Sequence, residues 1–252
     1  MPYINQIRIL SFYVFFLPIL AINISLYISV NWWQICNDLI PFITTDEICK
    51  NTVGSAIGYT FPYFDGEVSI SRTGRVFPSY WIFKPLMITT ALLLMKYWMD
   101  NFNLMNQINS ENKIKFYFRF FGLSSAVFLI IHSIFLGIKL DFEFYRIFRK
   151  FIVLSFIIFE LVAQVLLVLN LYKFKNLIKN LFIHLVLKLK ILLVISLSLI
   201  ATLSVPILIS SGNREIKHLL EWNFFTAVCF FYLLTYFFWK KNKTSVHTPE
   251  GV

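Results

Sequence analysis

Uncharged, apolar stretches of about twenty residues recur along this 252-residue chain and are separated by shorter charged segments. A membrane helix needs ~20 mostly apolar residues to cross ~30 Å of hydrocarbon, and a backbone in hydrocarbon must form its own hydrogen bonds, as a helix does. The pattern predicts an all-α, polytopic membrane protein with a single domain over residues 1–239. We expect six transmembrane helices, at residues 9–30, 80–99, 120–138, 151–172, 191–209 and 223–239.

Composition narrows the class of protein. Hydrophobic residues make up 58% of the chain and charged residues 14%, against roughly 45–50% and about 25% in typical globular proteins. These values exclude an ordinary soluble domain and a disordered chain. The net charge is +10, and the Lys and Arg residues lie at the ends of apolar runs and in short loops. We therefore expect membrane lipids as partners, and no nucleic acid.

The distribution of Lys and Arg also predicts an orientation. More Lys and Arg residues fall on the side of the membrane that holds the N-terminus than on the opposite side. The positive-inside rule therefore places both termini in the cytoplasm and the loop 31–79 outside it. The tail 240–252 is short and polar. The inner connection around residues 174–190 has helical spacing and reads as an interfacial amphipathic helix or as extensions of spans four and five. Its lysines either bind anionic headgroups on the inner face or simply anchor the chain: Lys173, Lys175, Lys179, Lys188 and Lys190.

The first outer loop is rich in turn-forming residues. Three of the eight Pro and four of the eight Gly lie in it, and a long ordered loop is commonly functional. We expect a structured cap over the outer helix ends, with short strands near residues 67–70. Cys36 and Cys49 both lie in this loop and either form a disulfide on an oxidising face or remain free thiols.

Several polar side chains fall where hydrocarbon makes them costly, and such residues often mark function. They are expected to line a polar cavity that opens outward beneath the cap: His132, Lys139, Arg149, Glu160, Gln164, His218 and Glu221. In a catalytic interpretation Glu160, His132 and Glu221 act as acid and base at a lipid headgroup or acyl bond. In the structural interpretation the same groups form hydrogen bonds between helices. The four histidines are scattered, so we expect no metal site, and no cofactor motif is present.

Two stretches resemble a known family. The first runs from Val68 to Gly74, with Pro78 and the segment 80–83 following, and the second opens with Glu221-Trp222 and ends at 234–236. Together with the six spans and the long first loop, they are similar to the Frag/DRAM/Sfk superfamily of six-span membrane proteins. That superfamily shares its fold with the N-terminal domain of CWH-type GPI-anchor remodelling factors. Arg72 departs from the pattern, because many relatives carry an acid there.

The resemblance implies which residues are the signature positions and what the protein does. Its signature positions are Ser71, Gly74, Pro78, Glu221 and Trp222. Gly74 is expected to adopt a positive φ, and Glu221 to bond loop amides or the nearby arginines. The implied role is non-enzymatic: organising lipids, as in lipid remodelling, lipid-kinase scaffolding or autophagy modulation, with a lipid-modifying protein as a partner. The first alternative is an intramembrane lipid acyl or headgroup transferase or hydrolase, and the second is a small-molecule transporter.

Overall fold

A computed structural model describes residues 3–39, 60–138, 143–210 and 212–240, and within them the secondary structure is helical apart from one isolated bridge between Phe182 and Trp239. The described part therefore has the all-α fold that the apolar periodicity predicts. The helices are α1 Tyr3–Leu39, α2 Ile70–Thr73, α3 Tyr80–Ile108, α4 Ile114–Phe135, α5 Glu143–Lys173, α6 His184–Ile209 and α7 Arg214–Phe238.

Five of these helices are long and apolar enough to cross a membrane: α1, over Tyr3–Trp32, and α4 to α7. This is compatible with a multi-pass membrane protein. Helix α3 is also long, but its second half carries Lys96, Asp100 and Asn101, so it is less apolar than the others. It coincides with the predicted second span and packs between α1 and α4.

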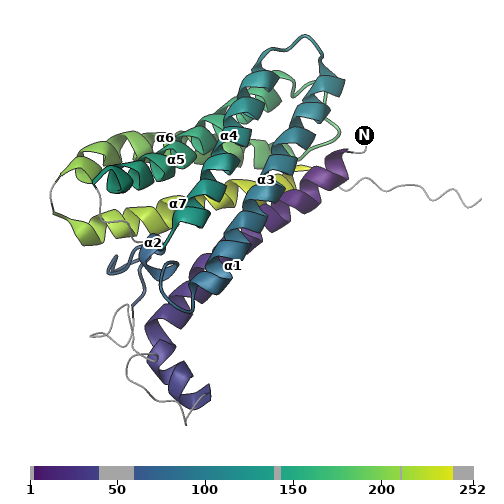
Figure 1. Cartoon of the computed structure of the whole chain (residues 1–252). Coiled ribbons are helices and arrows are strands. Elements are labelled where there is room, and N and C mark those ends of the chain that lie inside the picture. Colours follow the sequence, from purple (N-terminus) through teal and green to yellow (C-terminus); the bar gives the residue numbers. More distant parts are fainter. Residues whose placement is uncertain (1–2, 40–59, 139–142, 211, 241–252) are drawn as a thin grey trace, which may run out of the picture.

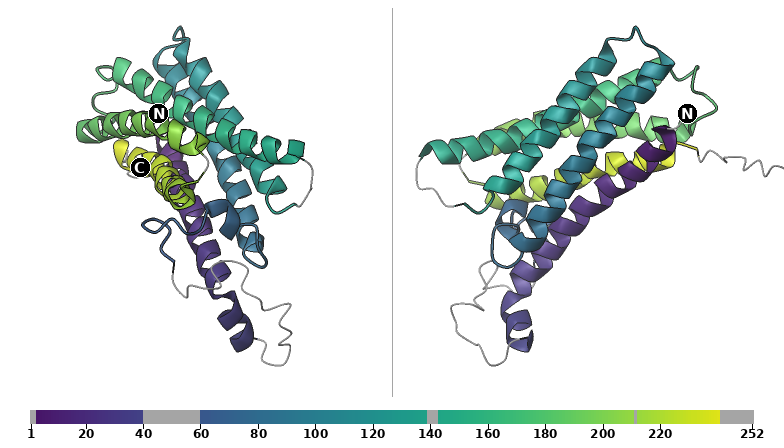
Figure 2. Two further views of the ribbon diagram at one scale, coloured as in Figure 1. Left: turned by 90° about the vertical axis from the view of Figure 1, so that its left-hand side faces the viewer. Right: turned by 45° about the vertical axis from the view of Figure 1, so that its right-hand side comes forward.

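The long helices pack in a continuous series. Helix α1 lies against α3 and α7, α3 against α4, α4 against α5, and α6 against both α5 and α7 (Figure 1). The N-terminus lies close to the end of α7, as both views in Figure 2 show. At the same end, the bridge between Phe182 and Trp239 and the bond from Lys240 N to Leu181 O tie the α5–α6 connection to the end of α7. We call this the terminus-bearing end, and the opposite end the loop-bearing end.

Small residues let the helices approach closely. Gly122 on α4 lies directly under the Trp98 ring of α3, and a Cβ placed there would be 2.3 Å from an indole carbon. Helices in lipid associate through such close packing, because hydrocarbon gives no hydrophobic drive between them. Gly122 therefore sets the distance between α3 and α4 at the point where the largest buried side chain sits.

The described part of the first loop folds back onto the bundle. Residues 70–73 form the single turn α2 instead of the strands that we expected nearby. Ile70 packs in a small apolar core with Ala21 and Ile22 of α1, Phe83 of α3 and Trp222 of α7. This core fixes the loop against the middle of α1 and near the loop-bearing ends of α3 and α7.

The connection between α5 and α6 is not helical. Residues 174–181 form turns, Phe182 forms the isolated bridge with Trp239, and α6 begins at His184. The structure thus has the expected helical extension of span five over residues 184–190 and has no separate interfacial helix there.

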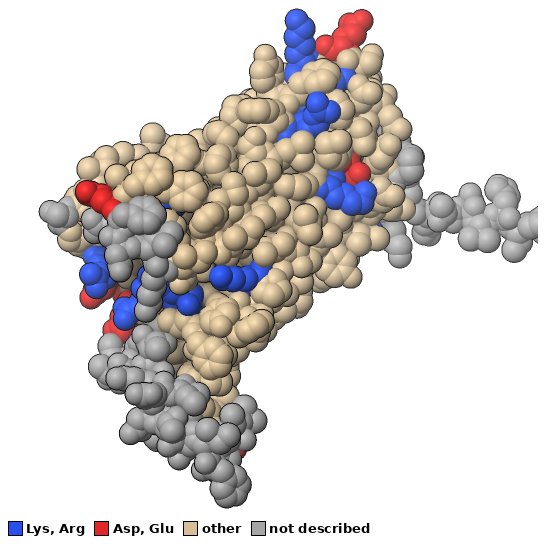
Figure 3. All heavy atoms as spheres, viewed as in Figure 1, with Lys and Arg blue, Asp and Glu red and all other residues tan. Residues whose placement is uncertain are grey.

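On the face that Figure 3 shows, charged side chains gather toward the two ends of the molecule and leave a broad uncharged belt between them. At the terminus-bearing end, the acids among the described residues are Asp100 and Glu111, whereas basic residues there are numerous. The loop-bearing end mixes both signs. A belt of this kind is what a surface in contact with hydrocarbon requires.

Candidate functional site

The start of α7 holds the loop that follows residue 60. The Trp222 indole Nε1 donates to Val68 O at 2.7 Å, and Asn223 Nδ2 donates to Tyr63 O at 2.9 Å. One turn earlier, His218 Nδ1 lies 2.9 Å from Gly66 O. The three contacts tie one face of α7 to the backbone of residues 63–68. We call this set of contacts the loop clamp.

Glu221 belongs to the same clamp. Its carboxyl faces the backbone amides of Ile70 and Ser71 at the start of α2, which is the first of the two kinds of partner expected for it. Amides at a helix start have no partner inside the helix, so a carboxylate there satisfies them. The two stretches that carry the family resemblance, more than a hundred residues apart, therefore meet at this clamp (Figure 1).

Gly74 differs from its expectation. It ends α2 with φ −77°, so no positive φ requires glycine at this position. The requirement is one of space, because a Cβ on Gly74 would lie 2.7 Å from the Phe83 ring. Pro78 follows in a cis peptide bond with Phe77, directly before α3.

Glu160 lies in a different place, at the centre of the helix bundle. It is buried on α5, and its Oε2 lies 2.6 Å from Ser125 Oγ of α4. Its Oε1 accepts bonds from Tyr232 of α7 and from Gln164 Nε2 of α5, the latter at 3.1 Å. The carboxyl thus joins three helices in one hydrogen-bonded group.

The hydrogens in this group can be counted. Ser125 Oγ also lies 2.8 Å from Gly122 O, and a hydroxyl has one hydrogen to donate. If Ser125 donates its hydrogen to Gly122 O, its oxygen can accept a hydrogen bond from a protonated Glu160. If Ser125 donates to Glu160 instead, the Glu160 carboxyl acts only as an acceptor. The buried Oε1 of Gln164 has no hydrogen-bond partner among the described residues, whereas the Nε1 of Trp98 lies beside the Glu160 carboxyl.

A second polar group continues this layer toward α6. Lys190 Nζ donates to Thr235 Oγ1 at 2.7 Å and lies 3.9 Å from the centre of the Phe231 ring. Thr235 Oγ1 in turn lies 3.3 Å from Tyr97 OH, and the Tyr97 ring packs edge-to-face on Tyr232. We call the two groups together the polar layer. Its members that the sequence did not single out are three hydroxyl side chains, Tyr97, Ser125 and Tyr232. Thr235 lies in the segment 234–236 that carries part of the family resemblance.

Lys190 requires a correction. It was expected on the inner surface with four other lysines, but its side chain is fully buried, whereas Lys173, Lys179 and Lys188 are exposed and Lys175 is half-buried. It therefore does not share their access to lipid headgroups. Periodicity alone could not separate them, because the turn of chain before α6 decides which face of the helix points inward.

The predicted outward polar cavity is divided in the structure. Glu160 and Gln164 lie in the polar layer, and His218 and Glu221 lie in the loop clamp. His132 lies near Arg149 at the loop-bearing end of α4. The three catalytic candidates, Glu160, His132 and Glu221, take part in three separate sets of contacts and do not share a hydrogen bond among the described residues.

Other expectations fall partly outside the described residues. Cys36 is buried and disulfide-bonded, and Cys229 is a free thiol, whereas Cys49 and Lys139 lie outside the described residues. Within the described ranges, no three His, Cys, Asp or Glu side chains gather as a metal ion would require. No protein-family model, curated protein or solved structure matches this chain significantly.

The hydrogen count predicts how Glu160 responds to substitution. Glu160→Gln keeps an acceptor for Tyr232 and a donor for Ser125, so we expect the free energy of unfolding to change by less than about 1 kcal/mol. Glu160→Ala opens a cavity and leaves buried donors unpaired, and should lower it by about 2–3 kcal/mol. Denaturant unfolding in bicelles measures both. A Gln variant as unstable as the Ala variant would show that the layer needs an ionised carboxylate.

The loop clamp predicts a local effect of Trp222. Trp222→Phe keeps an aromatic ring but leaves Val68 O unpaired, so opening of the loop should become easier by ~1–2 kcal/mol, with roughly tenfold faster amide exchange. Hydrogen exchange followed by mass spectrometry on peptides within residues 60–79 reports it. Trp81→Phe is the matched control, because the Trp81 ring is two-thirds exposed. Equal exchange in the two variants would show that the indole bond does not hold the loop.

Proposed function

We propose that this protein is a six-span integral membrane protein that binds and organises lipids without catalysing a reaction on them. In this proposal α3 is the predicted second span and completes the set of six, with its exposed face, which includes Trp81 and Leu92, turned toward lipid. The observation that carries the proposal is the distribution of charge: an uncharged belt separates two charged ends, and the terminus-bearing end is strongly basic. Such an end attracts anionic headgroups, at about 1 kcal/mol for each juxtamembrane Lys or Arg.

The same asymmetry supports an orientation with both termini in the cytoplasm. This orientation can be tested with single cysteines introduced at Phe64 and at Ser110, each compared with the parent chain. Both side chains are exposed, and they lie at opposite ends of the molecule. An impermeant maleimide should label Phe64→Cys in intact cells and Ser110→Cys only after permeabilisation. The reverse labelling would invert the proposed topology.

The resemblance to Frag/DRAM/Sfk proteins supports a lipid-linked role on separate grounds. Its signature residues Ser71, Glu221 and Trp222 belong to the loop clamp, so their part in this chain is to hold the cap and not to perform chemistry. A cap held in this way suits a protein that presents a lipid or a docking surface to a lipid-modifying partner.

An intramembrane enzyme is the second candidate. The observation that favours it is the polar layer, where Glu160 is buried beside Oε1 of Gln164, an atom without a hydrogen-bond partner in the described part of the chain. The separation of Glu160 from His132 and Glu221 removes the acid–base set on which the catalytic interpretation was built. A transporter would have to pass its substrate through the same layer.

The lipid proposal predicts selective retention without turnover. Purified from mixed-lipid membranes in detergent, the protein should carry anionic phospholipids enriched several-fold over the bulk, as measured by mass spectrometry of co-purified lipids. Labelled phospholipids in reconstituted vesicles should remain chemically unchanged and should not be accompanied by uptake of small solutes. Turnover that Glu160→Gln abolishes would establish the enzyme instead, and ion-coupled uptake would establish the transporter.

A further inference from the structure

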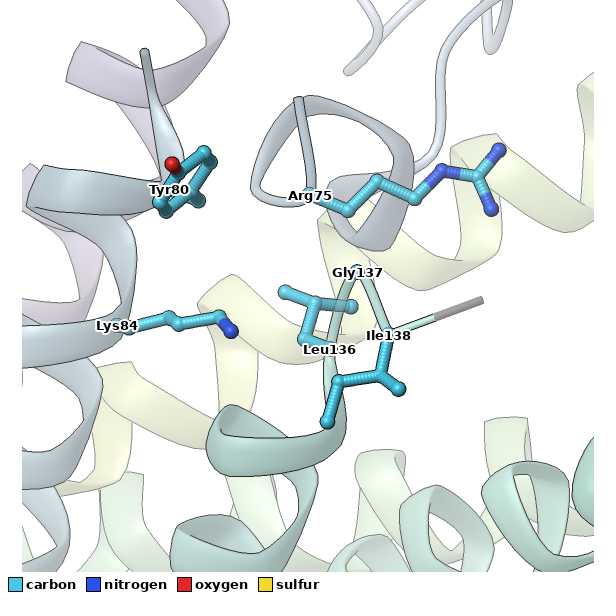
Figure 4. Close-up of a pocket in the computed structure, with 6 residues that line it drawn as sticks. All are labelled: Arg75, Tyr80, Lys84, Leu136, Gly137 and Ile138. Atoms are coloured by element: carbon cyan, nitrogen blue, oxygen red, sulfur yellow. The ribbon is translucent and has the colours of Figure 1, made fainter. Parts of the chain in front are cut away.

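A small cavity opens at the loop-bearing end, apart from both the loop clamp and the polar layer. It has a volume of about 260 Å³ and is lined by Arg75, Tyr80, Lys84, Leu136, Gly137 and Ile138. Figure 4 shows Tyr80 and Lys84 on one side, on α3, and the turn at 136–138 and the backbone of Arg75 on the other. Ligand pockets commonly measure ~300–1,000 Å³, so this one suits a headgroup and not a whole lipid.

The polar groups of the side chains that line the cavity are donors. Lys84 Nζ donates one bond, to Ile134 O at 3.3 Å, which leaves two further hydrogens on the ammonium group. The Tyr80 hydroxyl lies on the same helix face, one turn earlier, and forms no hydrogen bond with another described residue. Ammonium and hydroxyl donors of this kind bind phosphate oxygens.

Further positive charge lies at the rim. The Arg75 guanidinium extends away from Lys84 (Figure 4) and lies near Arg149 and Arg72. Partial burial, then the charges of Arg149 and Arg72, lower the pKa of Arg75 from its ordinary value. Lys84 and the three arginines form no ion pair with a carboxylate of the described residues. An ion pair in that part of the chain joins Lys96 and Asp100, elsewhere on α3. The positive charge of these four side chains is therefore not neutralised by a carboxylate within the described part of the chain.

The backbone allows the cavity to form between α3 and α4. Gly137 has φ +86°, a conformation that other residues rarely adopt. A Cβ added at this position would also lie only 3.2 Å from Arg75 O. The chain can therefore turn tightly after α4 and bring Leu136 and Ile138 beside the residues that precede α3.

The surroundings of the cavity are apolar. Phe77 is 48% exposed, Trp81 66% and Ile138 40%, and all three lie within a few positions of lining residues or line the cavity themselves. Exposed aromatic side chains at a span end are typical of the headgroup level of a membrane. A phosphate bound at this level would have acyl chains beside it, which favours a lipid over a soluble phosphate ester.

We propose that this cavity binds the phosphate group of an anionic phospholipid, an inference that rests on the lipid-linked function proposed above. Lys84 and Tyr80 hold the phosphate oxygens inside the cavity, and the arginines at the rim attract the headgroup. The binding is non-covalent and requires no acid, base or metal ion.

The test uses the full-length protein in phosphatidylcholine nanodiscs that contain either spin-labelled phosphatidic acid or spin-labelled phosphatidylcholine. Lys84→Met should reduce the preference for phosphatidic acid about fivefold. Ile138→Trp should reduce it similarly by filling the cavity without any change of charge. Lys150→Met is the matched control, because Lys150 is an exposed cation at the same end that does not line the cavity. Thermal unfolding of each variant verifies that it is folded.

The outcomes separate the two proposals. No preference in the unchanged protein would overturn the lipid-linked function and, if glycerol 3-phosphate also fails to bind, the site as well. A preference that Lys84→Met and Ile138→Trp leave intact would overturn the site alone, as would an equal loss in Lys150→Met. Calorimetry with soluble glycerol 3-phosphate identifies the source of the phosphate. If the protein binds this ester, if both cavity variants abolish the binding and if no lipid preference is seen, the cavity is a phosphate site but does not bind a lipid.

Discussion

A carboxyl group that cannot reach water organises the middle of this molecule. In hydrocarbon the helices gain nothing hydrophobic by meeting, so their mutual rotation depends on close packing and on polar groups that must find partners. Glu160 finds them on α4, α5 and α7, and the hydroxyl of Thr235 links α7 to Lys190 of α6. Because each of these bonds allows little change in rotation, the polar layer specifies which faces of the helices meet.

Outside that layer, the two ends of the bundle differ in character. The terminus-bearing end is basic and is closed by backbone bonds between the α5–α6 connection and the end of α7. The loop-bearing end carries a folded cap, which is held by side chains of α7 and has a basic cavity beside it. The end where basic residues are most numerous is thus distinct from the end that carries the cavity.

The predicted site residues show where sequence reasoning stops. Glu160, His132 and Glu221 were grouped because polar side chains are costly in a membrane and all three were expected to line one outward cavity. Depth along a helix follows from counting residues, but direction around the helix does not. Glu160 points into the bundle, and Glu221 points at the start of α2, so the shared cavity divides into a polar layer and a loop clamp. Gly74 shows the same limit, because the ring that excludes a side chain there belongs to α3.

The sequence by itself determined that the chain is helical, where its long helices run and that its surface is apolar, because these follow from the spacing of charges along one dimension. It also indicated that residues near 70 and 221 matter, through short motifs. Only the tertiary structure decided that these motifs meet, that Lys190 is buried while its neighbours are exposed, and that Lys84 and Arg75 line one cavity. Each of these depends on how helices distant in sequence are rotated against one another, and that rotation is set by packing and hydrogen bonds that no single segment contains.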